Sequence, residues 1–196
     1  LFRSFIYQGQ EIGMTNYPFE SIESFNDVAV KTEYQIVKKE GGDVNQLLDK
    51  YKMENRDNAR TPMQWNNSIN GGFTTGKPWF HVNPNYTEIN VKQQLNDKFS
   101  ILSYYKALIQ LKKSDLIYTY GKFNMVDAEN KQVFAYTRTF KNNTVLIVAN
   151  LTNEVSELNL PFELDISSAD IKLHNYHLND INLDHIKPYE AFVVEI

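Results

Sequence analysis

The polar stretch at residues 55–65 reads Asn55-Arg56-Asp57-Asn58-Ala59-Arg60-Thr61-Pro62-Met63-Gln64-Trp65. Two guanidinium groups, one carboxylate, three side-chain amides and an indole lie within these eleven residues. Neither an amphipathic helix nor an alternating strand has such a pattern. The stretch therefore indicates a functional site or a buried polar network, and we expect the rest of the chain to be organised around it.

Arg56 and Arg60 bear most directly on this choice. They are four residues apart and share one face if residues 56–60 form a helical turn, which Pro62 would limit. Arginine suits bidentate contact with a carboxylate or with vicinal hydroxyls. From the residues alone, a functional arginine and a buried structural network of Arg60 with Asp57 are equally compatible with the pattern.

Upstream of this stretch, residues 4–8 read as a short apolar strand closed by Gly9, and Glu11 follows at once. Polar groups directly after a short buried strand mark the C-terminal end of a strand in an α/β fold, where active sites lie. The alternative is that Glu11 only caps or pairs within the loop.

Two helices are expected between the strand and the polar stretch. The first runs from Asn26 to about Lys39 and is stopped by glycines, and the second starts from an N-cap at Asp43 and passes through Tyr51.

Downstream, residues 66–86 show neither helical nor strand periodicity. Such long irregular segments are usually functional or disordered, and the aromatic content argues for an ordered loop pinned by its aromatic side chains. A short helix is expected over 90–96. The clearest helix of the chain is expected over 99–113, where apolar residues recur at three- and four-residue spacing.

The pattern changes near Ser114 from helices to short strands with turn signals between them. Residues 141–143 predict a tight hairpin turn. Several short strands of this kind predict an antiparallel sheet or sandwich. The expected strands are Tyr118–Val126, Val133–Phe140, Thr144–Leu151, Glu157–Leu160, Ile171–Tyr176 and Phe192–Ile196.

Composition excludes several classes of function. The net charge is -4 with no basic stripe, which argues against a nucleic-acid partner. The absence of cysteine excludes disulfides and thiolate sites, and favours a reducing compartment. No apolar run approaches the ~20 residues of a membrane span, and the N-terminus is not a signal peptide. Strand-like sequence begins almost at residue 1, which suggests a chain cut from a longer one.

No metal or cofactor is expected from the titratable residues. His174 and His177 are three residues apart, but they flank a strand end and have no carboxylate or cysteine partners at ligand spacing. The order of residues permits a Ser-His-Asp triad, although no nucleophile-elbow pattern is present. There is also no phosphate-binding loop.

Long motifs resemble the α-glucosidase branch of glycoside hydrolase family 13, which includes oligo-1,6-glucosidases, dextran glucosidases and trehalose-6-phosphate hydrolases. The resemblance begins with residues 7–16 and 56–65 and covers the whole chain. It continues through Gly71-Gly72-Phe73-Thr74, Lys77-Pro78-Trp79, Val82-Asn83-Pro84-Asn85-Tyr86, Val148-Ala149-Asn150-Leu151-Thr152 and Lys187-Pro188-Tyr189-Glu190-Ala191.

The resemblance implies an α+β fragment. Residues 1–114 would be the last β/α unit of a (β/α)8 barrel, with strand eight at 4–8, a long loop, and helix eight at 98–113. Residues 115–196 would be the antiparallel β-sandwich C-terminal domain. This division agrees with the change of pattern near Ser114.

The resemblance also implies a retaining mechanism, in which a nucleophilic carboxylate and an acid/base carboxyl lie roughly 5–5.5 Å apart. In the family these groups, and a third carboxylate in an Asn-His-Asp motif, lie on strands four, five and seven. No Asn-His-Asp occurs here, so no catalytic residue is assigned to this chain.

Arg56 matches the family arginine that binds the non-reducing glucose. Gln8 and Glu11 match a strand-eight signature that is interpreted as mostly structural, and Asp57, Arg60 and Trp65 are interpreted as scaffold for the loop. The chain departs from the family pattern at Phe2-Arg3-Ser4, at Val28-Ala29-Val30 and at Asn66, where relatives usually have Asp.

These features predict the C-terminal part of a cytoplasmic α-glucosidase that acts on short α-glucosides and is inactive alone. Its expected partners are the missing N-terminal barrel portion and the α-glucoside substrate of the full-length enzyme, without membrane or nucleic acid. The alternative is a non-catalytic carbohydrate-binding or stabilising β module.

Overall fold

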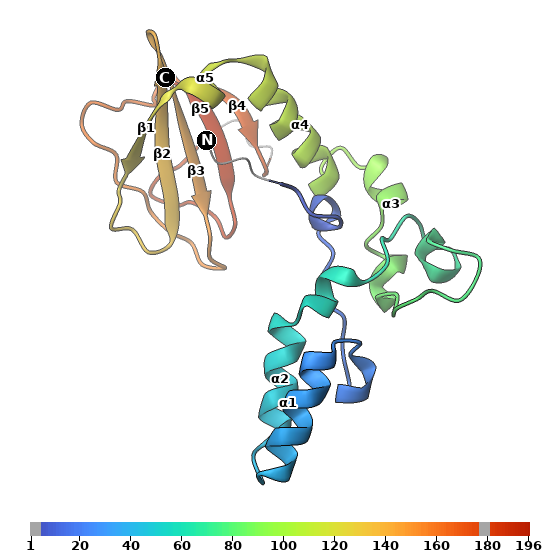
Figure 1. Cartoon of the computed structure of the whole chain (residues 1–196). Coiled ribbons are helices and arrows are strands. Elements are labelled where there is room, and N and C mark those ends of the chain that lie inside the picture. Colours follow the sequence, from blue (N-terminus) through green and yellow to red (C-terminus); the bar gives the residue numbers. More distant parts are fainter. Residues whose placement is uncertain (1–4, 177–180) are drawn as a thin grey trace. The chain divides into compact units, whose positions relative to one another are not determined.

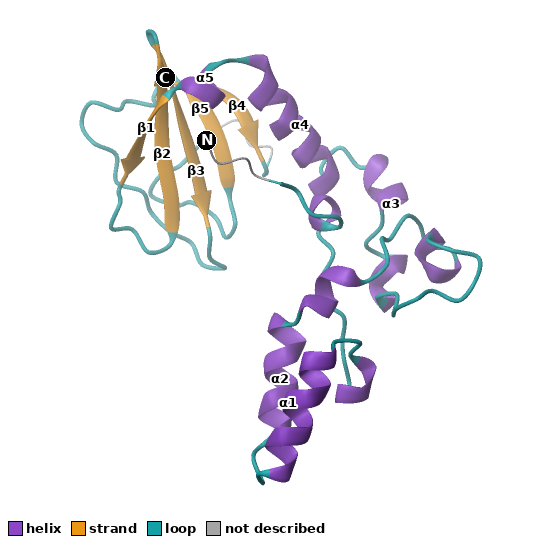
Figure 2. Ribbon diagram, in the orientation of Figure 1, coloured by secondary structure: helices purple, strands orange, loops and turns teal. Residues whose placement is uncertain are grey.

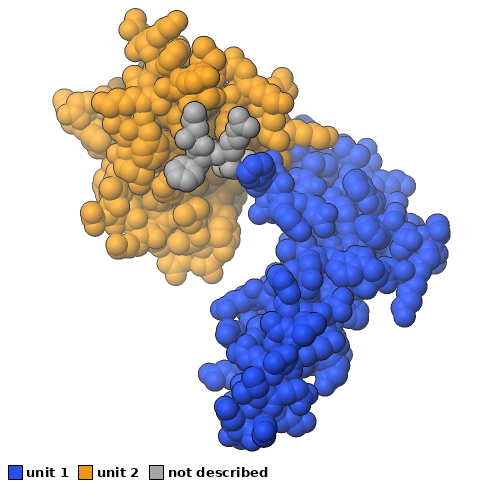
Figure 3. Space-filling view, viewed as in Figure 1, with its two compact units in different colours: residues 1–103 blue, residues 104–196 orange. Residues whose placement is uncertain are grey.

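The computed structural model describes residues 5–176 and 181–196. The chain divides into two compact units, Leu1–Ser103 and Tyr104–Ile196 (Figure 3). Helices and turns make up the first unit, and a sheet dominates the second (Figure 2).

A hairpin of two helices, α1 (Val28–Lys39) and α2 (Val44–Glu54), is the most regular part of the first unit (Figure 1). Asp27 caps α1 by accepting the N–H of Ala29 at 3.0 Å. Asp43 caps α2 by accepting two of its first N–H groups at 2.9 and 3.1 Å. Short acidic side chains at this position satisfy backbone donors that the helix itself leaves free. Both predicted helices and the Asp43 cap are confirmed.

Aromatic packing holds this hairpin against the segments on either side of it. The Phe19 and Phe25 rings stack with centroids 3.9 Å apart. Fully burying one such side chain stabilises the fold by ~1.5–3 kcal/mol. The buried cluster consists of Phe19, Ile22, Phe25, Val30 and Phe80, with Tyr17, Tyr34, Leu48 and Tyr51 packed around it.

The strand predicted over residues 4–8 is wrong for residues 5–8, which form no strand, and Ser4 lies outside the described residues. Phe5 is 87% exposed, and Ile6 and Tyr7 are exposed as well. A strand requires a hydrogen-bonded neighbour, and no described segment of this chain pairs with residues 5–8. Packing begins at the 3-10 turn η1 (Gln10–Ile12), where Ile12 is fully buried.

The long segment after the polar stretch is ordered by amides more than by aromatic rings. Gln64 Nε2 donates to Asn85 Oδ1 at 3.1 Å and to the Ile89 carbonyl at 2.6 Å. Asn83 Nδ2 donates to the carbonyls of residues 15 and 16 at 3.0 and 3.1 Å. Of the aromatic residues expected to pin the loop, Phe80 is buried but Trp79 is exposed. The prediction of order holds, while the predicted cause is only partly right.

Short helical turns lie where no regular structure was expected. They are η2 (Ile22–Ser24), η4 (Ile69–Gly72) and η5 (Pro84–Thr87). The expected short helix is α3 (Val91–Leu95), and the clearest predicted helix is α4 (Ile101–Ser114). None of the α4 residues is buried, although its apolar residues recur at helical spacing.

Unit 2 contains a five-stranded antiparallel sheet in the order β1-β2-β3-β5-β4 (Figure 1). The antiparallel arrangement is confirmed. The strands are β1 (Lys122–Val126), β2 (Val133–Phe140), β3 (Asn143–Asn150), β4 (Asp170–His174) and β5 (Ala191–Glu195). The predicted tight turn connects β2 to β3 through Lys141, whose φ is +56°.

One face of the sheet carries the core of this unit. Ala135, Leu146 and Val194 are completely buried there. Partly buried side chains from the loops, including Leu160, Leu164 and Ile181, pack over this face and supply the second layer. The alternation of buried and exposed residues along β2 and β3 follows from the two-residue period of a strand.

Two strand predictions are corrected. Residues 118–120 belong to the short helix α5 (Ile117–Tyr120), because the chain only enters the sheet after Gly121. Glu157–Leu160 forms no strand; an isolated bridge between Ser156 and Ile186 is the pairing found next to it. Its apolar residues face the sheet as covering loop, so burial is satisfied without a ladder.

Candidate functional site

The 3-10 turn η3 (Arg56–Arg60) places the polar stretch next to the N-terminus of α1. Asn55 caps this turn by accepting the N–H of Asp57 at 2.8 Å. Pro62 follows the turn and limits its extension, as the sequence predicted. The turn directs Arg56 toward Asp27, which lies 29 residues earlier in the chain.

Arg56 and Asp27 form a bidentate ion pair. Arg56 Nε donates to Asp27 Oδ2 at 2.6 Å, and Arg56 Nη2 donates to Asp27 Oδ1 at 2.9 Å. The Arg56 side chain is 68% exposed and the Asp27 side chain 6%. The hydrogen bonds from Arg56 hold the pKa of Asp27 below its ordinary value, and Asp27 raises the pKa of Arg56.

Asp57 and Arg60 form the buried network behind this pair. Arg60 Nη2 donates to Asp57 Oδ1, and the Asp57 side chain is fully buried. Asp57 Oδ2 also accepts the backbone N–H groups of Asn26 and Asp27 at 2.7 and 3.1 Å. The carboxylate therefore ties η3 to the start of α1, which supports the scaffold interpretation of both residues.

A polar cavity of about 450 Å³ opens beside Arg56. Gln8 lines it together with Arg56, so the structure brings these two predicted residues together. The other polar side chains that line it are Gln10, Thr15, Asn16, Glu54, Asn55, Asn58 and Thr61. Amides and hydroxyls around one guanidinium suit a ligand rich in hydroxyl groups.

Glu11 and Trp65 do not line this cavity. Glu11 Oε2 accepts the N–H of Gly9 at 2.7 Å and so stabilises the turn that carries Gln8. Gly9 has a φ of +92°, a conformation that favours glycine. Trp65 is 49% exposed, and its backbone N–H donates to the Gly71 carbonyl at 2.8 Å. Both arrangements are structural.

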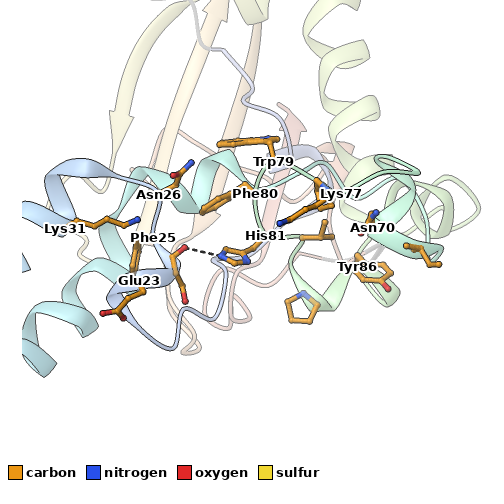
Figure 4. A pocket seen from close by; sticks show the side chains of 15 residues that line it. Glu23, Phe25, Asn26, Lys31, Asn70, Lys77, Trp79, Phe80, His81 and Tyr86 are labelled. Atoms are coloured by element: carbon orange, nitrogen blue, oxygen red, sulfur yellow. Dashed lines mark hydrogen bonds between the residues drawn. The ribbon is translucent and has the colours of Figure 1, made fainter.

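A second cavity of about 670 Å³ lies in the same unit and is walled by aromatic residues (Figure 4). Trp79 stacks on Phe80 with centroids 5.2 Å apart, and Phe80 contacts His81. His81 Nε2 lies 3.1 Å from the Ser24 carbonyl oxygen. These rings continue the packing of the aromatic core, and none of the predicted site residues lines the cavity.

A buried pair in the second unit was not anticipated. His174 Nε2 lies 2.7 Å from Glu190 Oε1, and both side chains are buried. The other Glu190 oxygen accepts the N–H of Lys187 at 2.6 Å, which fixes the turn before β5. His177 lies outside the described residues. Within 5–176 and 181–196, no three His, Cys, Asp or Glu side chains are grouped to hold a metal ion.

Asp27 is the site residue that the sequence-based interpretation missed as a partner of Arg56. The available signal was an Asn-Asp dipeptide directly before a predicted helix, which marks an N-cap. That signal predicts the cap but not the pairing, because the two residues meet only through folding. None of the described helices is long and apolar enough to cross a membrane.

Comparison with known families places the chain. Residues 3–121 match the family described as alpha amylase, catalytic domain, and residues 123–193 match the one described as maltogenic amylase, C-terminal domain. This chain belongs to the α-amylase family, glycoside hydrolase family 13. The resemblance stated from the motifs is thereby confirmed.

The relatives are oligosaccharide-cleaving enzymes by name. The chain is 43% identical to an oligo-1,6-glucosidase of Bacillus cereus over 98% of its own length and 35% of that protein. It is 40% identical to a trehalose-6-phosphate hydrolase of Escherichia coli over 77% of its own length and 27% of that protein. The chain thus spans about a third of the length of the curated relatives it matches.

Solved structures agree with this placement. A trehalose-6-phosphate hydrolase of Bacillus licheniformis superposes with a TM-score of 0.90 at 36% identity, covering 97% of this chain and 35% of that one. An isomaltulose synthase of Klebsiella sp. LX3 gives a TM-score of 0.87 at 36% identity, with 97% and 35% coverage. The predicted fold class, the C-terminal part of the barrel followed by an antiparallel β domain, is confirmed.

Proposed function

We propose that this chain is the C-terminal part of a retaining α-glucosidase that hydrolyses short α-glucosides, such as isomalto-oligosaccharides, in the cytoplasm. Residues 1–114 would complete the catalytic barrel, and residues 115–196 would be its β domain. Support comes from the family match and from relatives named oligo-1,6-glucosidase.

The ion-paired guanidinium of Arg56 at the polar cavity carries this proposal. It is exposed while its carboxylate partner is buried, so N–H groups remain for a ligand. Hydroxyl oxygens are suitable acceptors for such groups. In the proposed enzyme, Arg56 holds a hydroxyl of the non-reducing glucose, while Gln8, Asp57, Arg60, Glu11 and Trp65 maintain the surrounding structure.

The chemistry of glycoside cleavage would come from residues outside this chain. The Asn-His-Asp motif of the family does not occur in the sequence. Retaining cleavage requires two carboxyl groups roughly 5–5.5 Å apart, one as nucleophile and one as acid. We therefore expect no hydrolysis by the 196-residue chain alone.

The proposed protein partner is the N-terminal part of such a barrel. Helix α4 supports this, because Ile101, Leu108 and Ile109 on it are exposed apolar residues. An apolar stripe on a helix is normally buried against another element. Co-expression with the N-terminal two-thirds of the Bacillus cereus enzyme tests it: co-purification that is lost in Leu108→Glu/Ile109→Glu supports the partner, and separate elution contradicts it.

A fusion tests the enzymatic proposal. The Bacillus cereus oligo-1,6-glucosidase would be truncated before its matching region and continued by this chain. We expect the fusion to release glucose from isomaltose and the isolated chain to release none. A folded fusion without turnover, or turnover by the rigorously purified isolated chain, would contradict the proposal.

A second candidate function is a carbohydrate-binding β module, which one observation favours. The sheet face opposite the core presents Phe123, Phe134 and Tyr136, with neighbouring ring centroids 5.0 and 5.5 Å apart. Aromatic faces of this kind can stack on sugars or pack against another domain. Calorimetry with isomaltose and maltose on residues 115–196 distinguishes them: saturable binding lost in Phe123→Ala/Tyr136→Ala supports the module.

A further inference from the structure

We infer that Asp27 is a positioning residue, whose carboxylate fixes the guanidinium plane of Arg56 at the polar cavity for contact with an uncharged polyol. The role of Arg56 as a sugar contact rests on the proposed function, whereas the geometry of the pair does not. The pair joins η3 to the N-terminus of α1 and uses both carboxylate oxygens of Asp27.

The two bonds specify an orientation as well as an attraction. Bonds of 2.6 and 2.9 Å from Nε and Nη2 to two different oxygens restrict rotation of the guanidinium. Because the Arg56 side chain is 68% exposed, packing alone leaves it considerable rotamer freedom. The carboxylate is thus the main constraint on where the remaining N–H groups point.

Asp27 is itself held from two directions. Its Oδ1 accepts the N–H of Ala29 at 3.0 Å, as an N-cap does. Its own backbone N–H donates to Asp57 Oδ2 at 3.1 Å. The carboxylate is buried, so its position depends on these protein groups more than on solvent. A rigid acceptor of this kind can preorganise a flexible arginine.

The pairing also limits the class of ligand. A guanidinium has five N–H groups, and two of those on Arg56 are bonded to Asp27. The opposite charges cancel at close range, so an anionic ligand such as phosphate gains little attraction at this position. The remaining donors suit neutral oxygen acceptors, such as adjacent hydroxyls of a sugar.

The chain offers a matched control for the test. Asp43 is also an N-cap aspartate, on the neighbouring helix, and its side chain accepts only backbone N–H groups among its printed partners in the described structure. Asn is about as good an N-cap as Asp. Asp27→Asn therefore removes the charged acceptor and keeps the cap, while Asp43→Asn makes the same change without touching Arg56.

The pair is tested first on the full 196-residue chain by NMR of the arginine Nε–H signals. We expect the Arg56 Nε–H to exchange slowly with solvent in the wild type and in Asp43→Asn, and to exchange fast in Asp27→Asn. If Asp27→Asn unfolds, judged by circular dichroism, Asp27→Ser replaces it, because Ser also caps helices. Equal exchange in all variants would overturn the inference.

The functional arm uses the active fusion with the Bacillus cereus barrel. We expect Asp27→Asn to raise KM for isomaltose roughly tenfold with kcat nearly unchanged, since uniform binding is lost. Unchanged KM in Asp27→Asn, or Arg56-dependent inhibition by inorganic phosphate, would overturn it. A fusion inactive with wild-type residues counts against the proposed function alone, and the NMR result then decides the positioning role.

Discussion

The carboxylate of Asp57 accepts the backbone N–H of Asp27 at 3.1 Å, across 30 residues of sequence. A residue of the polar stretch thus fixes the backbone of the residue that binds Arg56. Through this contact the buried scaffold and the exposed arginine form one connected arrangement, and its parts can be tested separately.

Asp57→Ala should be strongly destabilising. The substitution leaves two backbone N–H groups and the Arg60 guanidinium without their acceptor, and breaking a buried pair costs about 3–5 kcal/mol, toward the lower end here because Arg60 is partly exposed. Urea unfolding of the full chain measures this cost. Asp49→Ala, which breaks an exposed pair with Lys52, should leave the midpoint unchanged. Equal effects of the two substitutions would contradict the role assigned to Asp57.

Stability should fall in acid partly through Asp27. The pKa of Asp27 is lowered from its ordinary 3.8, chiefly by the hydrogen bonds from Arg56. A group with a depressed pKa in the folded state stabilises it above the unfolded pKa, and this contribution is lost as pH falls through the folded pKa. Unfolding free energies measured from pH 6 downward should therefore drop less below about pH 4 in Asp27→Asn than in the wild type. Parallel curves would argue against the pair.

Gly9→Ala should disturb the turn that carries Gln8. Gly9 has a φ of +92°, and an added Cβ would lie 2.7 Å from the Met14 sulfur. Backbone strain of this kind costs about 1–3 kcal/mol. Gly76→Ala is the matched change, because its backbone is not left-handed and its Cβ would meet only Thr74 at 3.8 Å. A midpoint shift in Gly76→Ala as large as in Gly9→Ala would show that the turn geometry is not the cause.

Leu146→Ala should destabilise the second unit. Leu146 is completely buried in the sheet core, and truncating such a residue costs about 2–5 kcal/mol. Leu151→Ala removes the same atoms from an exposed position, so its effect on thermal unfolding should be small. If both variants melt alike, the assignment of the core face of the sheet is wrong.

Local signals explain which elements were predictable from the sequence. Helix α2 follows from its Asp43 cap and apolar spacing, and β2 and β3 follow from alternation around the turn at Lys141. These features depend on neighbours in sequence. The antiparallel domain and its core face follow from the same alternation.

Contacts between distant segments explain the rest. Residues 5–8 have strand composition, but strand structure depends on partners that the composition does not supply. Asp27 reads as a cap, and its pairing with Arg56 appears only when η3 and α1 come together. Glu157–Leu160 buries apolar side chains as a covering loop, a solution that strand patterns do not distinguish.

The most direct test of the central claim is isomaltose hydrolysis by the fusion of the Bacillus cereus barrel with this chain, compared with its Arg56→Gln variant. If the chain completes an α-glucosidase and supplies Arg56 as a sugar contact, the fusion will hydrolyse isomaltose and Arg56→Gln will lower kcat/KM by at least tenfold, about 1.4 kcal/mol. A correctly folded fusion without activity, or full activity in Arg56→Gln, would contradict that claim.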